Sequence, residues 1–149
     1  MSVDAKIYQE YNTIIRDLGQ KNCATAFQWC QANKTKLLRI NSQFEVKLIF
    51  QEFIELLKSN QHKEALQYIR KCPEPIKNQH IEEIKKAMGC LTFYNQIDKL
   101  PSYKFYFEDS RWDDLISIFR HDSFLVSGVT INTNLEISLK VGEGLEGLN

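Results

Sequence analysis

The chain has little glycine and little proline, with six and three copies among its 149 residues. Folds made of many short strands need frequent turns, which these two residues usually supply. No apolar run approaches the roughly 20 residues that span a membrane, and the amino terminus lacks the apolar stretch of a signal peptide. We therefore expect no turn-rich sheet and no membrane partner. We expect a soluble protein of the cytoplasm, with the nucleus as a second compartment.

Charge of neither sign is in excess, because lysine and arginine together number 19 and so do aspartate and glutamate. A chain without a net positive field lacks the electrostatic signature of a nucleic-acid or anionic-membrane binder. The basic group Lys34, Lys36 and Arg39 is more typical of an ordinary surface than of a phosphate site. With 43% apolar residues the chain can build a core, in one domain or in two tightly fused small ones.

The four cysteines lack the spacing of a metal site. Cys23, Cys30, Cys72 and Cys90 are separated by 7, 42 and 18 residues, and none forms the C-x-x-C pair that zinc sites usually contain. Without a secretion signal, disulfides are not expected either. We interpret all four thiols as small buried apolar groups and expect no metal.

The residues that catalysis needs do not converge in the sequence. Three histidines, His62, His80 and His121, lie in separate segments beside polar residues. The carboxylate pairs Glu82–Glu83 and Asp113–Asp114 lie opposite apolar stripes, as on a solvated helix face. The sequence has no glycine-rich phosphate loop, no G-x-S-x-G elbow and no H-E-x-x-H helix. We therefore expect no catalytic residue and no cofactor in this chain, and interpret the protein as not an enzyme.

The strongest helical signal lies in residues 42–71. Ser42 and Glu45 have the spacing of a capping box, which satisfies two free amide groups at the start of a helix. A wide apolar stripe of helical period follows: Phe44, Leu48, Ile49, Phe53, Ile54 and Leu57. More apolar residues lie off this stripe, which predicts a central helix covered on several sides. Asn60 marks a stop, and so short a turn predicts an antiparallel hairpin with the next helix.

Further apolar stripes of helical period predict an all-α fold of antiparallel hairpins. The predicted helices cover residues 4–18, 22–32, 43–59, 61–72, 79–93, 110–121 and 134–146. We expect Gly19 in the left-handed position that closes the first helix, and Asn22 and Asn78 at the start of later helices. Gly89 costs its helix about 1 kcal/mol relative to alanine, which predicts the close approach of a neighbouring helix.

Several short segments resemble a known motif. Phe53–Leu57, a polar turn and Glu64–Leu66 resemble the centre of the CTLH motif, and Ala26–Cys30 resembles its beginning. Downstream, Ala87–Gly89 resembles the start of a CRA domain and Arg111–Trp112 its later helix. In their order and spacing these pieces are similar to the CTLH/CRA family, most of all to subunits of the macrophage-erythroblast-attacher type in the GID/CTLH ubiquitin ligase.

The resemblance implies a CTLH-like helical region in residues 1–72 and a CRA-like helical region in residues 73–149. Members of this family often carry a LisH motif before CTLH and a RING-like zinc module after CRA, and we find neither motif in this sequence. We therefore expect a non-catalytic scaffold for protein–protein interaction within a multisubunit E3 ubiquitin ligase. The implied partners are other CTLH/LisH-type subunits, in a homodimer or a heterodimer.

The carboxyl-terminal part gives conflicting signals. Residues 95–101 are predicted as a loop, and residues 124–131 as irregular or extended. From Leu135 to Val141 apolar and polar residues alternate, which favours a strand. The resemblance implies a helix, and a lone strand would have no partner, so we predict a helix over 134–146. We expect this helix to fold back on the first helix or to bind another chain. The expected contacts on the first helix are Tyr8, Tyr11 and Ile15.

Two groups of large apolar residues exceed what one small helical core readily buries. Core packing explains each residue taken singly, but as groups they are candidate surfaces for a partner. The candidate interface residues are Tyr103, Phe105, Tyr106, Phe107, Leu135, Leu139, Leu145 and Leu148. An alternative function is a free-standing helical-repeat adaptor that binds a linear peptide motif in a groove between helix pairs.

Removal of metal ions is expected to leave the fold unchanged, because the cysteines lack ligand spacing. The melting temperature should be the same with and without EDTA. A fall of several degrees, together with stoichiometric zinc in the purified chain, would contradict this interpretation.

Overall fold

The computed structural model describes the backbone of residues 3–141 and the side chains of residues 5–128. Within residues 3–141 the elements are all helices, joined by short turns, and there is no strand, which confirms the all-α prediction. No helix in this range is long and apolar enough to cross a membrane. The α-helices are α1 (Val3–Gly19), α2 (Ala24–Ala32), α3 (Lys34–Arg39), α4 (Phe44–Lys58), α5 (His62–Arg70), α6 (Glu74–Gln79), α7 (Ile81–Thr92), α8 (Pro101–Lys104) and α9 (Ser110–Val141). Two 3₁₀ turns, η1 (Tyr94–Lys99) and η2 (Phe105–Phe107), flank α8.

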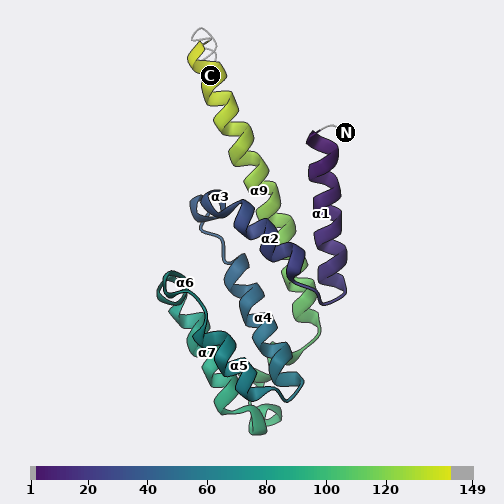
Figure 1. Ribbon diagram of the computed structural model, residues 1–149, viewed down its shortest axis with the longest axis vertical. Helices are drawn as coiled ribbons and strands as arrows, with labels where there is room; N and C mark the ends of the chain where they lie inside the picture. The colour runs from purple at the N-terminus through teal and green to yellow at the C-terminus, as the bar shows by residue number, and fades with distance from the viewer. Residues whose placement is uncertain (1–2, 142–149) are drawn as a thin grey trace.

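Helix α4 runs through the middle of the molecule and contributes to two hydrophobic cores (Figure 1). Its first two turns bury Phe44 and Leu48 in an upper core with α1, α2, α3 and α9. Its later turns bury Phe53, Ile54 and Leu57 in a lower core with α5 and α7. The predicted central helix, covered on several sides, is therefore confirmed.

The upper core is built around three aromatic rings from three helices. The Trp29 ring of α2 meets Phe44 of α4 and Phe119 of α9 edge-on, with centroids 6.0 and 4.9 Å apart. The Phe44 and Phe119 rings lie 5.7 Å apart. Around them pack the buried side chains of Ile14, Leu18, Cys23, Ala26, Cys30, Leu37, Leu48, Trp112, Leu115 and Val126. Such ring pairs add to the free energy gained by burial alone.

The lower core is the predicted hairpin of α4 and α5, closed by α7. Ala65 and Ile69 of α5 pack against the later turns of α4, and Ala87 and Cys90 of α7 cover the remaining side. The hydroxyl group of Tyr68 donates a hydrogen bond of 2.5 Å to Glu52 across the hairpin. The antiparallel hairpin is confirmed.

Three helices end in the same way, with a residue in the left-handed region. Lys21, Asn41 and Asn60 have φ values of 60°, 54° and 60°. After each of these residues, the next amide group donates to the carbonyl five residues earlier, as in the Schellman motif. Asn60 thus ends α4 as predicted. The prediction for Gly19 was wrong, because Lys21 holds the left-handed position two residues later.

Two predicted helix starts differ in the structure. The amide group of Ser42 donates to the Leu37 carbonyl at 3.0 Å, so the capping box with Glu45 does not form. The Ser42 hydroxyl instead accepts a bond of 3.0 Å from the Phe44 amide. The prediction for Asn78 was also wrong, since it lies inside α6, a helix with proline in its first turn. Asn22 was predicted correctly, and its side chain accepts a bond of 2.9 Å from the Ala24 amide.

Helix α9 was predicted as two helices separated by an irregular piece over residues 124–131, and this was wrong. The helix is continuous from Ser110 to Val141. Its buried side chains continue into the supposed break, with Val126 in the upper core. A single glycine, Gly128, costs a helix only about 1 kcal/mol, which this packing offsets. Residues 134–141 are helical rather than extended, as predicted, and residues 142–146 lie outside the described residues.

The segment after α7 also differs from its prediction. The expected loop over 95–101 is mostly the 3₁₀ turn η1, followed by α8. Gly89 has the close neighbour that its position in a helix predicted. A Cβ atom at Gly89 would lie 2.6 Å from the ring of Tyr103, which projects from α8. The aromatic ring can therefore lie directly on the backbone of α7.

Replacement of Leu57 by alanine should lower the free energy of unfolding by about 2–5 kcal/mol, because the fully buried side chain leaves a cavity. Urea denaturation followed by circular dichroism measures the change. Leu38→Ala is the matched control, because Leu38 is 61% exposed and should change stability by no more than about 0.5 kcal/mol. Equal midpoints for the two variants would show that α4 is not the centre of the core.

The four cysteines should resist alkylation in the folded chain. All four are buried, and burial raises the pKa of the Cys23 and Cys90 thiols to about 12. Burial also raises the pKa of Cys30 and Cys72. Since the thiolate is the reactive form, iodoacetamide at pH 8 should label the native chain slowly and the urea-unfolded chain completely. A cysteine that reacts equally fast in both states would contradict the burial of that residue.

Candidate interaction surfaces

The aromatic segment from α8 to η2 covers the lower core with three of its four rings. Ring centroids lie 5.8 Å apart for Tyr103 and Phe93, and 5.0 Å apart for Tyr106 and Phe50. The Phe107 ring packs on Tyr94 at 5.8 Å. These three residues are half-buried. The sequence predicted a partner role for all four rings. Because three of them pack on the lower core, the surface that this segment offers to a partner comes mainly from the fourth ring, Phe105.

Phe105 is that remaining ring, and 44% of its surface is exposed. The guanidinium carbon of Arg111 lies 4.7 Å from the centroid of the Phe105 ring and 5.2 Å from that of Tyr106. Such a cation–π contact holds the arginine over the rings. The surface here presents an aromatic face together with a positive charge. The four aromatic candidates stay a prediction as partner residues.

The second predicted group lies at the other end of the molecule. Leu135 and Leu139 belong to the last turns of α9, and Leu145 and Leu148 lie outside the described residues. Figure 1 shows that this end of α9 extends beyond the amino-terminal end of α1 and beyond α2 and α3. These four candidates also stay a prediction.

The expected folding back onto the first helix was wrong for residues 134–141, which continue α9 in the same direction (Figure 1). Residues 142–149 lie outside the described residues. The ring of Tyr11 lies 5.4 Å from Phe119, and Ile15 also packs against the upper core. Tyr8 remains 67% exposed.

The structure reveals exposed apolar residues that the sequence reasoning did not select. Phe124 of α9 is 76% exposed, and Ile7 and Tyr8 of α1, a helix that packs against α9, are 53% and 67% exposed. The signal was present in the sequence. The apolar stripe of the first helix already includes Ile7 and Tyr8. We call Ile7, Tyr8 and Phe124 the upper apolar residues.

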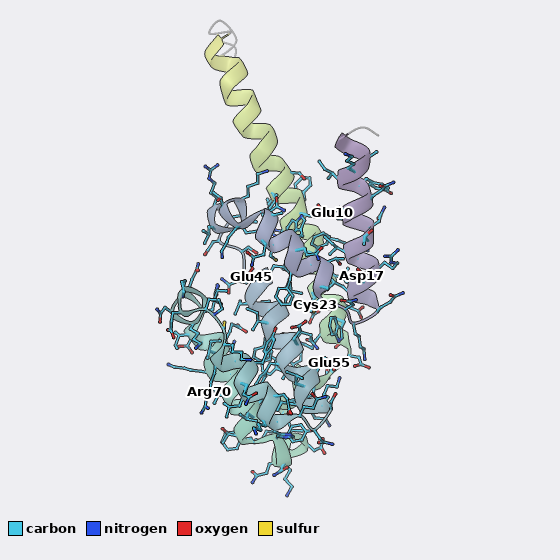
Figure 2. The ribbon with its side chains drawn as sticks, in the orientation of Figure 1. Glu10, Asp17, Cys23, Glu45, Glu55 and Arg70 are labelled. Carbon is cyan, nitrogen blue, oxygen red and sulfur yellow. The ribbon has the colours of Figure 1, made fainter. Side chains whose placement is uncertain are left out.

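Polar contacts fix α9 in the position that exposes this end. The Ser42 hydroxyl donates a bond of 2.5 Å to the buried carboxylate of Asp122, and Nδ1 of His121 lies 3.0 Å from the other oxygen of that carboxylate. Lower down, Nε1 of Trp112 donates a bond of 2.9 Å to Glu55 of α4, which is labelled in Figure 2. The start of α9 and its middle are therefore both held against α4 and the turn before it.

A third set of contacts consists of ion pairs on the surface, which hold Asp109, the residue just before α9. Lys21, after α1, and Lys58, at the end of α4, each place Nζ 3.0 Å from the same carboxylate oxygen of Asp109. Hydrogen bonds from Lys21 and Lys58 lower the pKa of Asp109 below its ordinary value. Because Asp109 is exposed, its ion pairs with Lys21 and Lys58 orient the start of α9 but add little to the free energy of unfolding.

The titratable residues that could suggest catalysis lie apart. The His62 ring packs edge-on against Tyr94 at 4.5 Å, His121 contacts Asp122, and His80 lines a groove between α3 and α6. Among the described residues, no group of three or more histidine, cysteine, aspartate or glutamate side chains is arranged to hold a metal ion.

Comparison with known proteins agrees with this architecture. Residues 7–145 match the family described as CTLH/CRA C-terminal to LisH motif domain. The chain is 34% identical over 143 residues to Protein MAEA homolog of Arabidopsis thaliana, covering 94% of this chain and 34% of that protein. It is 29% identical over 147 residues to the E3 ubiquitin-protein ligase RMND5A of Xenopus tropicalis, covering 95% of this chain and 37% of that protein.

A fungal relative is similar as well. Protein FYV10 of Pyricularia oryzae is 32% identical over 120 residues, which cover 78% of this chain and 29% of that protein. The chain thus spans about a third of the length of the curated relatives it matches. No solved structure gives a significant match. Because the family match covers nearly the whole sequence and the fold is helical as that family requires, the chain belongs to the CTLH/CRA domain family.

Proposed function

We propose that this chain is a non-catalytic scaffold for protein–protein interaction within a multisubunit E3 ubiquitin ligase. The family match and the similarity to RMND5A, which is named as an E3 ubiquitin-protein ligase, support this proposal. The chain corresponds to about a third of such a relative, and ubiquitin transfer is a property of the whole protein. The role proposed for the CTLH/CRA part is to hold subunits together.

The observation that carries the proposal is the upper end of the molecule. Tyr8 of α1 is 67% exposed and Phe124 of α9 is 76% exposed. Figure 1 shows the amino-terminal end of α1 and the extended end of α9 at this end of the molecule. Removal of apolar surface from water is favourable by roughly 25 cal/mol per Å², so these residues gain free energy when another chain covers them. The proposed partner is another CTLH/LisH-type subunit, in a homodimer or a heterodimer, which packs helix against helix.

A scaffold must also keep a fixed shape between its ends. Helix α4 belongs to both cores, and α9 is held to it by Ser42–Asp122 and Trp112–Glu55. We infer that the CTLH-like region 1–72 and the CRA-like region 73–149 act as one rigid unit joined through this helix. The position of a bound subunit at the upper end would then be fixed relative to the aromatic segment at the lower end.

The double variant Leu139→Asp with Leu145→Asp should weaken assembly with partner subunits by at least about a hundredfold. Each leucine is worth roughly 1.5–3 kcal/mol when buried, and a buried aspartate adds a further cost. Co-purification from cells followed by mass spectrometry measures the recovery of ligase subunits. The variant should weaken assembly more than it destabilises the hairpin of α4 and α5, and urea denaturation followed by circular dichroism measures the second effect.

Ser138→Asp is the matched control, since it adds a charge to the same part of α9 without removing an apolar side chain. Normal recovery of ligase subunits with the control, and loss with the double variant, is the expected result. If the double variant assembles as well as the wild type, the tail is not an interface. If the wild type recovers no ligase subunit, the scaffold proposal itself fails.

A further inference from the structure

A groove of about 190 Å³ lies between α3, the start of α4 and α6. Its apolar lining includes Leu37 and Val46, which are buried, and Ile76, which is half-buried. Leu38 also lines the groove and is exposed, so it stands at the rim. A cavity of roughly 150 Å³ holds a molecule of benzene, so this space accommodates one aliphatic side chain.

Glu45 places a carboxylate in this groove. Figure 2 shows Glu45 at the amino end of α4, on the side that faces α3 and α6. The residue is half-buried, and within the part of the chain that the structure describes its carboxylate forms no hydrogen bond and no ion pair. Its place in the first turn of α4 is favourable for a negative charge. Even so, a partly desolvated carboxylate without a partner gains free energy when a cation binds to it.

Two lysines near Glu45, Lys47 and Lys77, already contact other groups. Nζ of Lys47, on α4, lies 3.9 Å from Glu83 of α7. Nζ of Lys77, on α6, lies 3.6 Å from Glu74 and donates to the carbonyl of Arg70 at 2.7 Å. Lys34 lines the groove too, but it is exposed and forms no ion pair with Glu45. The carboxylate is therefore open to a cation from outside the chain.

His80 also lines the groove. Burial lowers the pKa of His80 below its ordinary value of 6.5, so its imidazole ring is uncharged at neutral pH. An uncharged ring does not repel a bound cation and can donate or accept a hydrogen bond. The groove thus combines an apolar floor, a neutral ring and a single half-buried negative group.

We propose that this groove binds a short peptide segment of a partner protein. The segment inserts one aliphatic side chain between Leu37, Val46 and Ile76, and it places a lysine or arginine beside Glu45. The carboxyl-terminal residues 142–149 of this chain contain two glutamates and no lysine or arginine, so they lack the cation that Glu45 requires. Peptide binding here is independent of the subunit contact proposed at the upper end.

The test uses the full chain, immobilised, and a synthetic library of acetylated heptapeptides with leucine at the centre and random flanking residues. Captured peptides should be enriched in lysine and arginine at flanking positions. With the Glu45→Lys variant the enrichment should change to aspartate and glutamate, because the charge in the groove is reversed. Capture without any preference for basic residues would overturn the proposal.

The best captured peptide is then labelled with fluorescein, and its affinity is measured by anisotropy. Glu45→Gln should weaken binding about tenfold through loss of the charge pair, and Leu38→Ser should weaken it about three- to tenfold through loss of apolar contact. Glu82→Gln is the matched control. Like Glu45 it lies in the first turn of a helix, but it is exposed, pairs with Lys85 at 3.5 Å and should leave affinity unchanged.

Circular dichroism confirms that each variant is folded, and Leu38→Ser keeps the test valid if a change at Glu45 disturbs α4. Equal affinities for wild type, Glu45→Gln and Leu38→Ser would overturn the proposal.

Sedimentation velocity of the wild type and of Leu38→Ser supplies a second criterion. If the chain self-associates and Leu38→Ser abolishes that association, the groove is occupied by a second copy and the peptide proposal fails. Loss of ligase subunits in cells, with peptide binding retained, would affect only the scaffold proposal.

Discussion

The contact between Trp29, Phe44 and Phe119 is the constraint on which the architecture depends. The three rings come from α2, α4 and α9, which are far apart in the sequence, and they meet at the first turn of α4. This contact places α9 against α4 and leaves α1 to pack along the other side of α9 through Tyr11. The direction in which α9 leaves the body follows from these rings and from the bond between Ser42 and Asp122.

Much of the fold could be predicted from the sequence because local and tertiary preferences agree there. Around Phe53 and Leu57 the apolar period, the stop at Asn60 and the short turn all favour the same hairpin, and the structure confirms it. The prediction was wrong at residues 124–131, where β-branched residues and Gly128 weaken the local helical signal. Burial of Val126 against distant helices decides the structure there, and no local pattern contains that information.

The candidate surfaces were less predictable for a related reason. Apolar residues on helices look alike in a sequence whether another helix covers them or not. Tyr106 and Phe107 lie over the lower core, while Phe124 on the outward side of α9 remains exposed. Only the packing of the helices distinguishes these cases. Glu45 shows the same limitation, because its spacing from Ser42 indicated a cap, whereas the fold leaves its carboxylate beside a groove.

Helix α4 has one more consequence, which concerns cooperativity. Since the same helix contributes side chains to both cores, melting of α4 in one core removes part of the other. The chain should therefore unfold as a single unit, as small domains usually do. A partner that binds only the folded form at one end then stabilises the whole chain by RT ln(1 + [L]/Kd), where [L] is the free concentration of that partner. Occupancy of one surface would in this way protect the opposite end from proteolysis without any change of shape.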